Sequence, residues 1–392
     1  MASQDLQNGA YRPSAPSRSI LYLVHNLSDA AVRKRVKMLT AAGCDIEVVG
    51  FCRDATPPSD VEGAKAVAIG QTFDANLGQR VKAVLKNIPR VKFWRKKLQH
   101  TDTIVARNLE MLLLAQFAST LTGGKRVVYE SLDIHRSLLG SKLISRALRA
   151  IEGFLLSRSV LVLYSSPAFW REYFIPFHGA ATPGLLIENK VLSLGPVPDG
   201  VTAEVEDPNI RTIGWFGNLR CRKSLARLKA IADHADGGIK ILVAGKPSAA
   251  EFPNFGEDIR HAHISYHGSY TAEDLPDLYS RCQFAWSIDY FEEGQNSSWL
   301  LPNRIYESSL FNCVPIALEN VETGRWLQSR CAGFLIPDDM SDQQIADRIQ
   351  AMAPQSFSKM QGEVAKIPRE DLVAGEADCE VLAKAITEGL DA

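Results

Sequence analysis

The segment SILYLVHNLSDAAVRKRVKMLTAAGCDIEVVGF, residues 19–51, shows an alternation that recurs along the whole chain. It begins with a short apolar run at residues 19–24, and residues 29–42 then carry apolar side chains at helical spacing. Gly43 ends that helix, and a second apolar run follows at residues 46–51. A strand, a helix and a strand in this order predict a βαβ unit, in which the two strands lie parallel.

The alternation continues on both sides of the middle of the chain. In the first half we expect further strands at residues 103–106, 126–129 and 160–164, and helices at 109–121 and 138–156. In the second half we expect strands at residues 212–216, 240–244, 263–267, 284–288 and 314–317, and helices at 224–234, 274–280 and 303–310. This pattern predicts an α/β chain with two doubly wound parallel sheets, which bind ligands at the carboxyl ends of their strands in a central cleft.

Local composition divides the chain into segments. Residues 1–17 are polar and rich in Ser and Pro, so we expect a disordered tail and no secretory signal. Residues 195–209 hold three prolines, two glycines and four acids without periodicity, which predicts a linker. We therefore expect an N-terminal domain at residues 18–194, a C-terminal domain at 210–350, and C-terminal helices at 351–392 that pack back across the lobes.

The composition of the 392 residues is that of a globular protein, with 46% hydrophobic and 23% charged residues. It excludes a disordered or collagen-like chain, and no apolar run approaches the ~20 residues that span a bilayer. The seven cysteines never form a Cys-x-x-Cys pair, which indicates reduced thiols in a cytoplasm. His261, His263 and His267 have no carboxylate or cysteine at ligand spacing, so we expect no metal site.

The net charge of −1 conceals an asymmetry between the two halves. Residues 1–195 contain 26 Lys and Arg against 15 Asp and Glu, a balance of +11, whereas the rest has 18 against 30, a balance of −12. A basic lobe indicates an anionic partner such as acidic lipid, phosphate or nucleic acid. No nucleic-acid-binding motif accompanies the charge, so we expect no nucleic-acid partner.

The basic charge is densest at residues 80–97, which contain eight cations, no acid and interleaved apolar side chains. This pattern is typical of an interfacial helix on an anionic membrane, although a solvated helix packed on the sheet would share it. Residues 138–156 could extend the same face through Lys142, Arg146 and Arg149. The residues that we expect at the membrane are Arg90, Lys92, Trp94, Arg95, Lys96 and Lys97.

The segment LPNRIYESSLFNCVPIALE, residues 301–319, has the most informative chemistry. Pro302 suits the start of a helix, in which Asn303, Arg304 and Glu307 occupy the first turns. A guanidinium offers a two-pronged donor for phosphate, and a carboxylate one turn later could accept hydrogen bonds from two sugar hydroxyls. The alternative is an intrahelical charge pair with only a structural role.

This segment resembles the donor-binding segment of GT-B glycosyltransferases, especially bacterial members similar to glycosyltransferase family four. The family pattern is matched here by Pro302, Asn303, Arg304, Glu307 and Pro315. The resemblance implies the GT-B architecture, in which two Rossmann-like domains face a central cleft. It also implies that Glu307 binds the donor ribose and that Arg304 approaches the diphosphate.

Two further segments of the second half agree with this resemblance. The segment WFGNLRCRK is similar to the loop after the first strand of the C-terminal domain, where Gly217 would let the backbone approach the diphosphate. The segment HGSY is similar to the turn that meets the nucleobase, on which Tyr270 could stack. The other donor-binding residues implied by the resemblance are Asn218, Arg222 and Lys223.

One departure from the family concerns a pair of glutamates that many relatives carry with seven residues between them. The position that should hold the first glutamate is Trp299 in this chain. Glu293 is a candidate replacement, and the alternative is that Asn296, Ser297 and Ser298 contact the sugar directly. The donor sugar and the stereochemistry of transfer therefore stay open.

In the first half, the segment VVYESLDIH places acidic residues just after a strand, on the cleft side of a parallel sheet. The family often has an acid near this position that serves as general base, so we expect Asp133 to be catalytic, with Glu130 or His135 as substitutes. The alternative role of Asp133 is a helix cap. His25 and Arg107 also follow strands and are expected to contact the acceptor or to support residues that do.

The resemblance implies a metal-independent hexosyltransferase that takes its sugar from a nucleotide diphosphate sugar, and we expect UDP-glucose as donor because that donor is common. The resemblance implies a polyprenyl-diphosphate-linked glycan as acceptor, in succinoglycan-type exopolysaccharide biosynthesis, and a cytoplasmic protein peripheral to the inner membrane surface. The alternative is a catalytically silent scaffold that binds nucleotide sugar. A nicotinamide-dependent oxidoreductase is disfavoured because the Gly-x-Gly-x-x-Gly fingerprint follows neither first strand.

Overall fold

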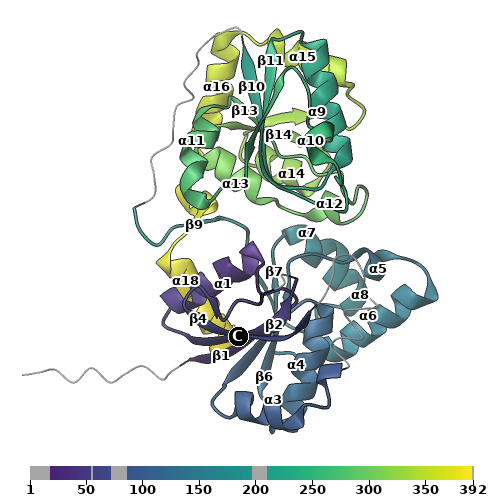
Figure 1. The fold of residues 1–392 in the computed structure, drawn as a ribbon, viewed down its shortest axis with the longest axis vertical. Helices are drawn as coiled ribbons and strands as arrows, with labels where there is room; N and C mark the ends of the chain where they lie inside the picture. Colours follow the sequence, from purple (N-terminus) through teal and green to yellow (C-terminus); the bar gives the residue numbers. More distant parts are fainter. Residues whose placement is uncertain (1–17, 54–55, 72–85, 197–209, 391–392) are drawn as a thin grey trace, which may run out of the picture.

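The computed structural model describes residues 18–53, 56–71, 86–196 and 210–390, which form two lobes around two separate sheets (Figure 1). The expected tail at 1–17, most of the expected linker and residues 80–85 of the basic segment lie outside the described residues. We call residues 18–196 the N-terminal lobe and residues 210–372 the C-terminal lobe. In the described part of the chain, no helix is long and apolar enough to cross a membrane.

The N-terminal lobe is built on an eight-stranded sheet of order β3-β4-β2-β1-β5-β6-β7-β8. All neighbours are parallel except the short pair β3 and β4. The strands are β1 Ser19–Val24, β2 Asp45–Cys52, β3 Asp60–Val61, β4 Ala64–Gln71, β5 Thr103–Arg107, β6 Arg126–Ser131, β7 Leu161–Tyr164 and β8 Gly184–Leu186. The helices are α1 Ala30–Ala41, α3 Val91–Leu98, α4 Leu109–Leu121, α5 Arg136–Leu139, α6 Leu143–Leu156, α7 Pro167–Phe169, a π-helical turn Trp170–Phe174 and α8 Ile175–His178.

The single helix expected at residues 138–156 is divided into α5 and α6. The backbone is extended at Gly140, with φ −69° and ψ 161°, and again at Lys142. Arg149 stabilises this break because its guanidinium donates hydrogen bonds to the carbonyl oxygens of Leu138 and, at 2.9 Å, of Gly140. The break therefore gives α6 its own direction and sets it at the outer side of the lobe (Figure 1).

The C-terminal lobe has a fully parallel six-stranded sheet of order β12-β11-β10-β13-β14-β15. Its strands are β10 Arg211–Leu219, β11 Ile239–Pro247, β12 Ile264–Gly268, β13 Phe284–Trp286, β14 Val314–Leu318 and β15 Phe334–Ile336. Its helices are α9 Arg222–His234, α10 Phe255–Asp258, a 3₁₀ turn Ala272–Asp274, α11 Leu275–Ser280, α12 Asn296–Trp299, α13 Asn303–Leu310, α14 Glu322–Gln328, α15 Asp342–Gln350, α16 Pro354–Ala365 and α17 Arg369–Leu372.

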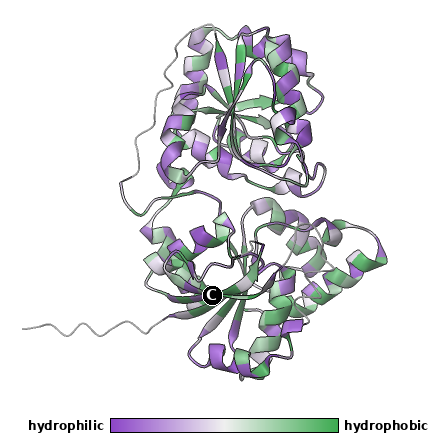
Figure 2. Ribbon diagram, viewed as in Figure 1, coloured by the Kyte–Doolittle hydropathy of each residue, from purple (hydrophilic) through white to green (hydrophobic). Residues whose placement is uncertain are grey.

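The core consists of apolar layers on both faces of each sheet. Central strands such as β1 and β10 are buried along most of their length, as expected for parallel strands with helices on both sides. Figure 2 shows this arrangement as green strands inside helices that are green on one side and purple on the other. Burial at about 25 cal/mol per Å² of apolar surface is the main force that holds each layer together.

The end of the chain returns to the N-terminal lobe. The last helix, α18 Glu376–Thr387, packs against α1, and its Cys379, Leu382 and Ile386 are fully buried in the same apolar layer as strand β1 (Figure 1). Just before α18, the short strand β16 Val373–Ala374 pairs in parallel with β9 Val191–Leu192. The N-terminal lobe is therefore completed by residues from both ends of the sequence.

Candidate active site between the two lobes

Two glycines mark the carboxyl ends of the neighbouring strands β10 and β11. Gly217 has φ +116° and Gly245 has φ +136°, a region that favours glycine, and the two are register partners. A Cβ on Gly245 would lie 1.8 Å from the carbonyl oxygen of Gly217, whereas a Cβ on Gly217 would meet nothing within 4 Å. The backbone at Gly217 and the neighbouring exposed Asn218 is therefore open to a ligand.

Helix α13 presents Glu307 beside two tyrosines. Ile305 and Tyr306 face the core, and Glu307 is half-buried and accepts a hydrogen bond from the hydroxyl of Tyr279 at 3.2 Å. Burial raises the pKa of Glu307, and that hydrogen bond partly opposes the effect. Tyr270 packs edge-on against Phe216 with ring centroids 6.3 Å apart, and the pKa of its hydroxyl is raised by burial and by the charge of Glu307.

Two cations also act on Glu307, and they come from different lobes. Arg304, one turn earlier on α13, donates a hydrogen bond to the carbonyl oxygen of Trp286 at 3.2 Å. Lys34 lies on α1 of the N-terminal lobe, and burial lowers the pKa of its ammonium group to about 8, with Glu307 acting in the opposite direction. Both charges lower the pKa of Glu307, so this carboxyl group lies where the two lobes meet. Asn303, at the start of α13, is exposed.

Asp133 follows β6 and is hydrogen-bonded by a residue of the other lobe. The amide nitrogen of Asn296 donates to Oδ1 of Asp133 at 3.3 Å, and the Oδ1 atom of Asn296 accepts from the backbone N–H of Ile134 at 3.0 Å. Asn296 is 3% exposed, whereas Asp133 faces solvent. The nearby protein atoms raise the pKa of Asp133 by desolvation, against the opposing effects of Arg220, Asn296 and Arg107.

The cap of helix α5 is provided by His135. Its Nδ1 atom accepts a hydrogen bond from the backbone N–H of Ser137 at 3.2 Å. The capping role considered for Asp133 thus belongs to a neighbouring residue, and the carboxylate of Asp133 is directed at Asn296 instead.

Two charged residues that sequence analysis did not select lie close to Asp133. Arg220 forms an ion pair with Asp289 at 3.4 Å and stacks on Phe291 with 4.7 Å between its guanidinium carbon and the ring centroid. Glu292 is half-buried, and its pKa is raised by burial and then by the charge of Asp133. The charge of Arg220 lowers the pKa of both carboxyl groups. Signals for both residues were present, because Arg220 lies inside the segment WFGNLRCRK and Glu292 adjoins Glu293.

The other charged residues of these two loops contact each other. The ammonium group of Lys223 lies 2.7 Å from both carboxylate oxygens of Glu293 and 4.4 Å from the centroid of the Tyr290 ring. Arg222 lies over Phe252, with 5.1 Å between its guanidinium carbon and the ring centroid. Glu293 is therefore paired with Lys223, whereas Glu292 is the acid whose pKa the charge of Asp133 raises.

Glu130 is the centre of a buried network in the N-terminal lobe. It has no exposed surface, and it accepts hydrogen bonds from Arg35 Nε at 2.6 Å and from the hydroxyl of Tyr22. Burial acts to raise the pKa of Glu130, but the charges of Arg35 and Arg107 together with the Tyr22 hydrogen bond lower it below its usual range. Glu130 is therefore a support for cleft residues and has no access to an acceptor hydroxyl.

Arg107 and His25 connect this network to Asp29 at the start of helix α1. Arg107 is 4% exposed, and its Nη2 atom lies 3.7 Å from Oδ1 of Asp29. The Nε2 atom of His25 lies 3.5 Å from Oδ2 of the same carboxylate. Asp29 also caps α1 by accepting a hydrogen bond from the backbone N–H of Ala31 at 2.8 Å, so helix α1 and the network hold each other in place.

The structure corrects the membrane prediction for Trp94. This side chain is fully buried and donates a hydrogen bond from Nε1 to the carbonyl oxygen of Asn87 at 3.0 Å. Lys97 forms an ion pair with Glu47, and α3 packs against α4. The remaining cations, Arg90, Lys92, Arg95 and Lys96, are exposed. The apolar side of helix α3 therefore packs on the core. This agrees with the alternative interpretation of the basic segment as a solvated helix packed on the sheet.

Metal ligands do not gather in the part of the chain that the structure describes, where no group of three His, Cys, Asp or Glu side chains could hold a metal ion. His261 Nε2 lies 2.9 Å from Oδ1 of Asp233 and its ring packs against that of His263.

Several solved structures share the fold of this chain. Sucrose-phosphate synthase from Thermosynechococcus elongatus matches with a TM-score of 0.72 at 13% identity, over 94% of this chain and 98% of that chain. Anabaena HepE in complex with UDP and glucose matches with a TM-score of 0.61 at 16% identity, over 95% and 96%. WaaG, a glycosyltransferase involved in lipopolysaccharide biosynthesis, matches with 0.62 at 11%, over 94% and 100%. The fold is therefore that of GT-B glycosyltransferases, as the resemblance implied.

Sequence comparison identifies a narrower group within this class. No family model matches the chain. The chain is 36% identical over 372 residues to the succinoglycan biosynthesis protein ExoL of Rhizobium meliloti strain 1021, which covers 93% of this chain and 92% of that protein. The chain belongs to the family of ExoL, which confirms the expected relation to succinoglycan-type exopolysaccharide proteins.

Proposed function

We propose that this protein is a glycosyltransferase of exopolysaccharide biosynthesis. It transfers a hexose, with glucose as the expected sugar, from a UDP-sugar to a polyprenyl-diphosphate-linked glycan at the inner membrane surface. The observation that carries the proposal is the cluster of Asp133, Asn296, Arg220 and Glu292, which joins the carboxyl ends of strands from both lobes. The name of the relative ExoL and the UDP and glucose in HepE support the pathway and the donor.

The donor would bind to the C-terminal lobe. In this proposal Glu307 accepts hydrogen bonds from the ribose hydroxyls, and Tyr270 contacts the base. The open backbone at Gly217 lets the diphosphate approach β10, where Arg304 and Arg220 supply positive charge. Lys223 adds to this charge when it exchanges its exposed partner Glu293 for the diphosphate, since an exposed ion pair of this kind is weak.

Asp133 would be the general base. Its raised pKa makes it a stronger base than an ordinary aspartate, and its hydrogen bond to Asn296 fixes the direction of the carboxylate. The acceptor hydroxyl gives its proton to Asp133, its oxygen forms a bond to the anomeric carbon, and the bond from that carbon to the diphosphate breaks with release of UDP. The cations near β10 stabilise the charge that develops on the diphosphate, and we propose that they do so without a metal ion.

A catalytically silent nucleotide-sugar-binding scaffold is the second candidate, because Trp299 occupies the place of a glutamate that many relatives carry. Trp299 packs on the core of the N-terminal lobe, and its carbonyl oxygen accepts a hydrogen bond from the hydroxyl of Ser166. Both candidate functions predict that the protein binds the donor, but only the glycosyltransferase predicts turnover.

The test combines ligand binding and turnover. UDP should raise the melting temperature more than GDP, CMP, dTDP or NAD, because a ligand that binds only the folded state stabilises it by about 2.7 kcal/mol at 100 times its dissociation constant. Asp133→Asn should lose turnover of UDP-glucose and lipid-linked acceptor by roughly 10²- to 10⁴-fold while it keeps the UDP shift. Asp339→Asn, at an exposed aspartate, is the matched control. Donor binding without any turnover in the parent protein would favour the scaffold.

A further inference from the structure

Helix α6 carries an apolar stripe on its solvent side. Ile144, Ile151 and Phe154 follow each other at helical spacing and are 72%, 46% and 58% exposed, with Leu143 at 79%. The inner side of the helix is buried in the core and includes Ser145, Glu152 and Leu156. Figure 2 shows green along the outer part of α6 at the edge of the N-terminal lobe. The helix therefore has an apolar side that the rest of the described chain leaves uncovered.

Cations surround this apolar stripe, whereas the acidic residue of the helix lies in the protein interior. Lys142, Arg146 and Arg158 are exposed, and the guanidinium carbon of Arg158 lies 3.7 Å from the centroid of the Phe154 ring. Glu152, the acidic residue of α6, is fully buried, with hydrogen bonds from Tyr129 at 2.9 Å and from Tyr173 and with His178 Nε2 at 2.9 Å. The exposed side of α6 thus combines apolar and positively charged groups.

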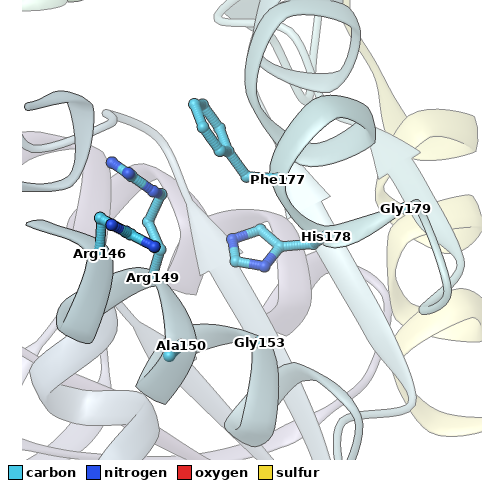
Figure 3. A pocket seen from close by; sticks show the side chains of 7 residues that line it. All are labelled: Arg146, Arg149, Ala150, Gly153, Phe177, His178 and Gly179. Atoms are coloured by element: carbon cyan, nitrogen blue, oxygen red, sulfur yellow. The ribbon is translucent and has the colours of Figure 1, made fainter. Parts of the chain in front are cut away.

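A hollow of about 540 Å³ opens between α6 and α8 beside the stripe. Figure 3 shows Arg146 and Arg149 on α6 extending toward Phe177 and His178 on the other side. The Arg149 guanidinium lies 4.5 Å from the Phe177 ring centroid and is held by the α5–α6 break, so its position is fixed by the fold. Gly153 lies on the hollow's lining, where a Cβ would come 3.2 Å from Nδ1 of His178.

We propose that α6 and α8 form a docking surface for an anionic lipid bilayer, with the hollow receiving a lipid phosphate. Exposed Ile175 and Phe177 of α8 continue the apolar side. An amphipathic helix that lies in a bilayer interface needs this combination, since its apolar side enters the acyl boundary while its cations meet anionic headgroups. We expect this surface, and not α3 with its buried Trp94 and Leu98, to contact the bilayer. It serves the proposed function because a lipid-linked acceptor requires the protein at a membrane.

The apolar part is tested with the full-length protein and sedimentation of lipid vesicles. Binding to phosphatidylglycerol vesicles is expected, with little binding to phosphatidylcholine vesicles and a decrease at high salt. The double change Ile151→Ser and Phe154→Ser should weaken the binding by roughly tenfold or more. Val381→Ser on α18, which is 56% exposed, is the matched control and should bind as the parent does. Unchanged binding of the double variant, or no binding of the parent, overturns the proposal.

The hollow is tested by charge reversal. Arg146→Glu should weaken binding to phosphatidylglycerol vesicles by about 20-fold, because two units of charge change near the surface. Lys359→Glu, at an exposed position on α16, is the matched control. Equal effects of the two changes would show that only net charge matters, and would overturn the hollow as a headgroup site. Inorganic phosphate should displace the protein from the vesicles more than chloride does at equal ionic strength, because free phosphate competes with the lipid phosphate for the hollow. Equal displacement by the two anions would overturn the hollow as a phosphate site.

The vesicle experiments and the nucleotide experiments can give negative results independently of each other. A protein that is stabilised by UDP but ignores anionic vesicles contradicts the docking surface alone. A protein that binds vesicles through α6 but no nucleotide contradicts the glycosyltransferase alone. Melting temperatures of all variants should match the parent, since each change is at an exposed side chain, and this comparison excludes misfolding as the cause of lost binding.

Discussion

At Asp133 desolvation by the surrounding protein atoms and a neighbouring cation act in opposite directions on one carboxyl group. Desolvation raises its pKa, and the charge of Arg220 lowers it. Removing the cation in Arg220→Gln should therefore raise the pKa of Asp133 further. Because a base works only when deprotonated, the acidic limb of the kcat/KM profile should move to higher pH. Arg222→Gln, which removes a cation stacked on Phe252, should leave the limb where it is, and an unmoved limb in Arg220→Gln would contradict the assignment of Asp133 as base.

Glu130 is a fully buried carboxylate that Arg35 contacts directly, with 2.6 Å between Nε and Oε1. Arg35→Met leaves its carboxylate buried and should lower the free energy of unfolding by about 3–5 kcal/mol at neutral pH. The lowered pKa of Glu130 stabilises the parent above the carboxyl pKa of the unfolded chain, and this contribution is lost as the pH falls through the lower folded value. The difference between parent and variant should thus shrink in acid.

Urea unfolding at several pH values measures this difference, and Arg260→Met is its control. The side chains of Arg260 and Glu257 are 74% and 69% exposed, so their pair should contribute at most about 1 kcal/mol. If the difference in free energy of unfolding between the parent and Arg35→Met did not depend on pH, Glu130 would not be the group whose negative charge Arg35 balances.

At the scale of elements, the packing of β10 on β11 depends on a missing side chain. Gly245→Ala places a Cβ against the Gly217 carbonyl oxygen at a φ of +136°, so we expect a loss of stability of at least about 1–3 kcal/mol together with weaker UDP binding. Calorimetric titration and thermal unfolding measure the two effects. Gly256→Ala on α10 meets nothing within 4 Å and should stabilise slightly. A neutral Gly245→Ala would contradict the close approach of the two strands.

The elements that sequence analysis located well are those with local causes. Helix α1 has Asp29 as its N-cap and apolar residues at regular spacing, and β1 is one apolar run, so both were predictable from a few neighbouring residues. The break between α5 and α6 was missed because it depends on hydrogen bonds from Arg149, nine residues after Gly140. Strands β3 and β4 were also missed, since β3 is only two residues long and the apolar residues of β4 are mostly small.

The candidate site residues show the same limit of sequence analysis. Asp133 and Glu307 were predicted from motifs and remain predictions, whereas Arg220 and Glu292 differ from their neighbours only in the folded chain, where their charges act on Asp133 or respond to it. Amphipathic periodicity showed that the segment of Trp94 has an apolar side, but not whether protein or membrane covers it. The answer lies in the packing of α3 against α4, which no local pattern reveals.

At the scale of the whole molecule, the N-terminal lobe depends on the end of the chain. Leu382→Ala on α18 removes a fully buried side chain and should lower the free energy of unfolding by about 2–5 kcal/mol. Val381→Ala, one residue earlier and 56% exposed, should stay within about 0.5 kcal/mol of the parent. Denaturant unfolding measures both, and similar values for the two variants would mean that α18 contributes little to the lobe.

The chain passes between the lobes twice, and the short strands β9 and β16, one beside each passage, pair in parallel. Two neighbouring connections let the lobes rotate about a single hinge axis and restrict sliding and twisting of one lobe against the other. We therefore expect one angle to describe opening and closing of the molecule. One pair of fluorescent labels, one on each lobe, would then follow the entire motion, and the angle would change with UDP while each lobe keeps its internal distances.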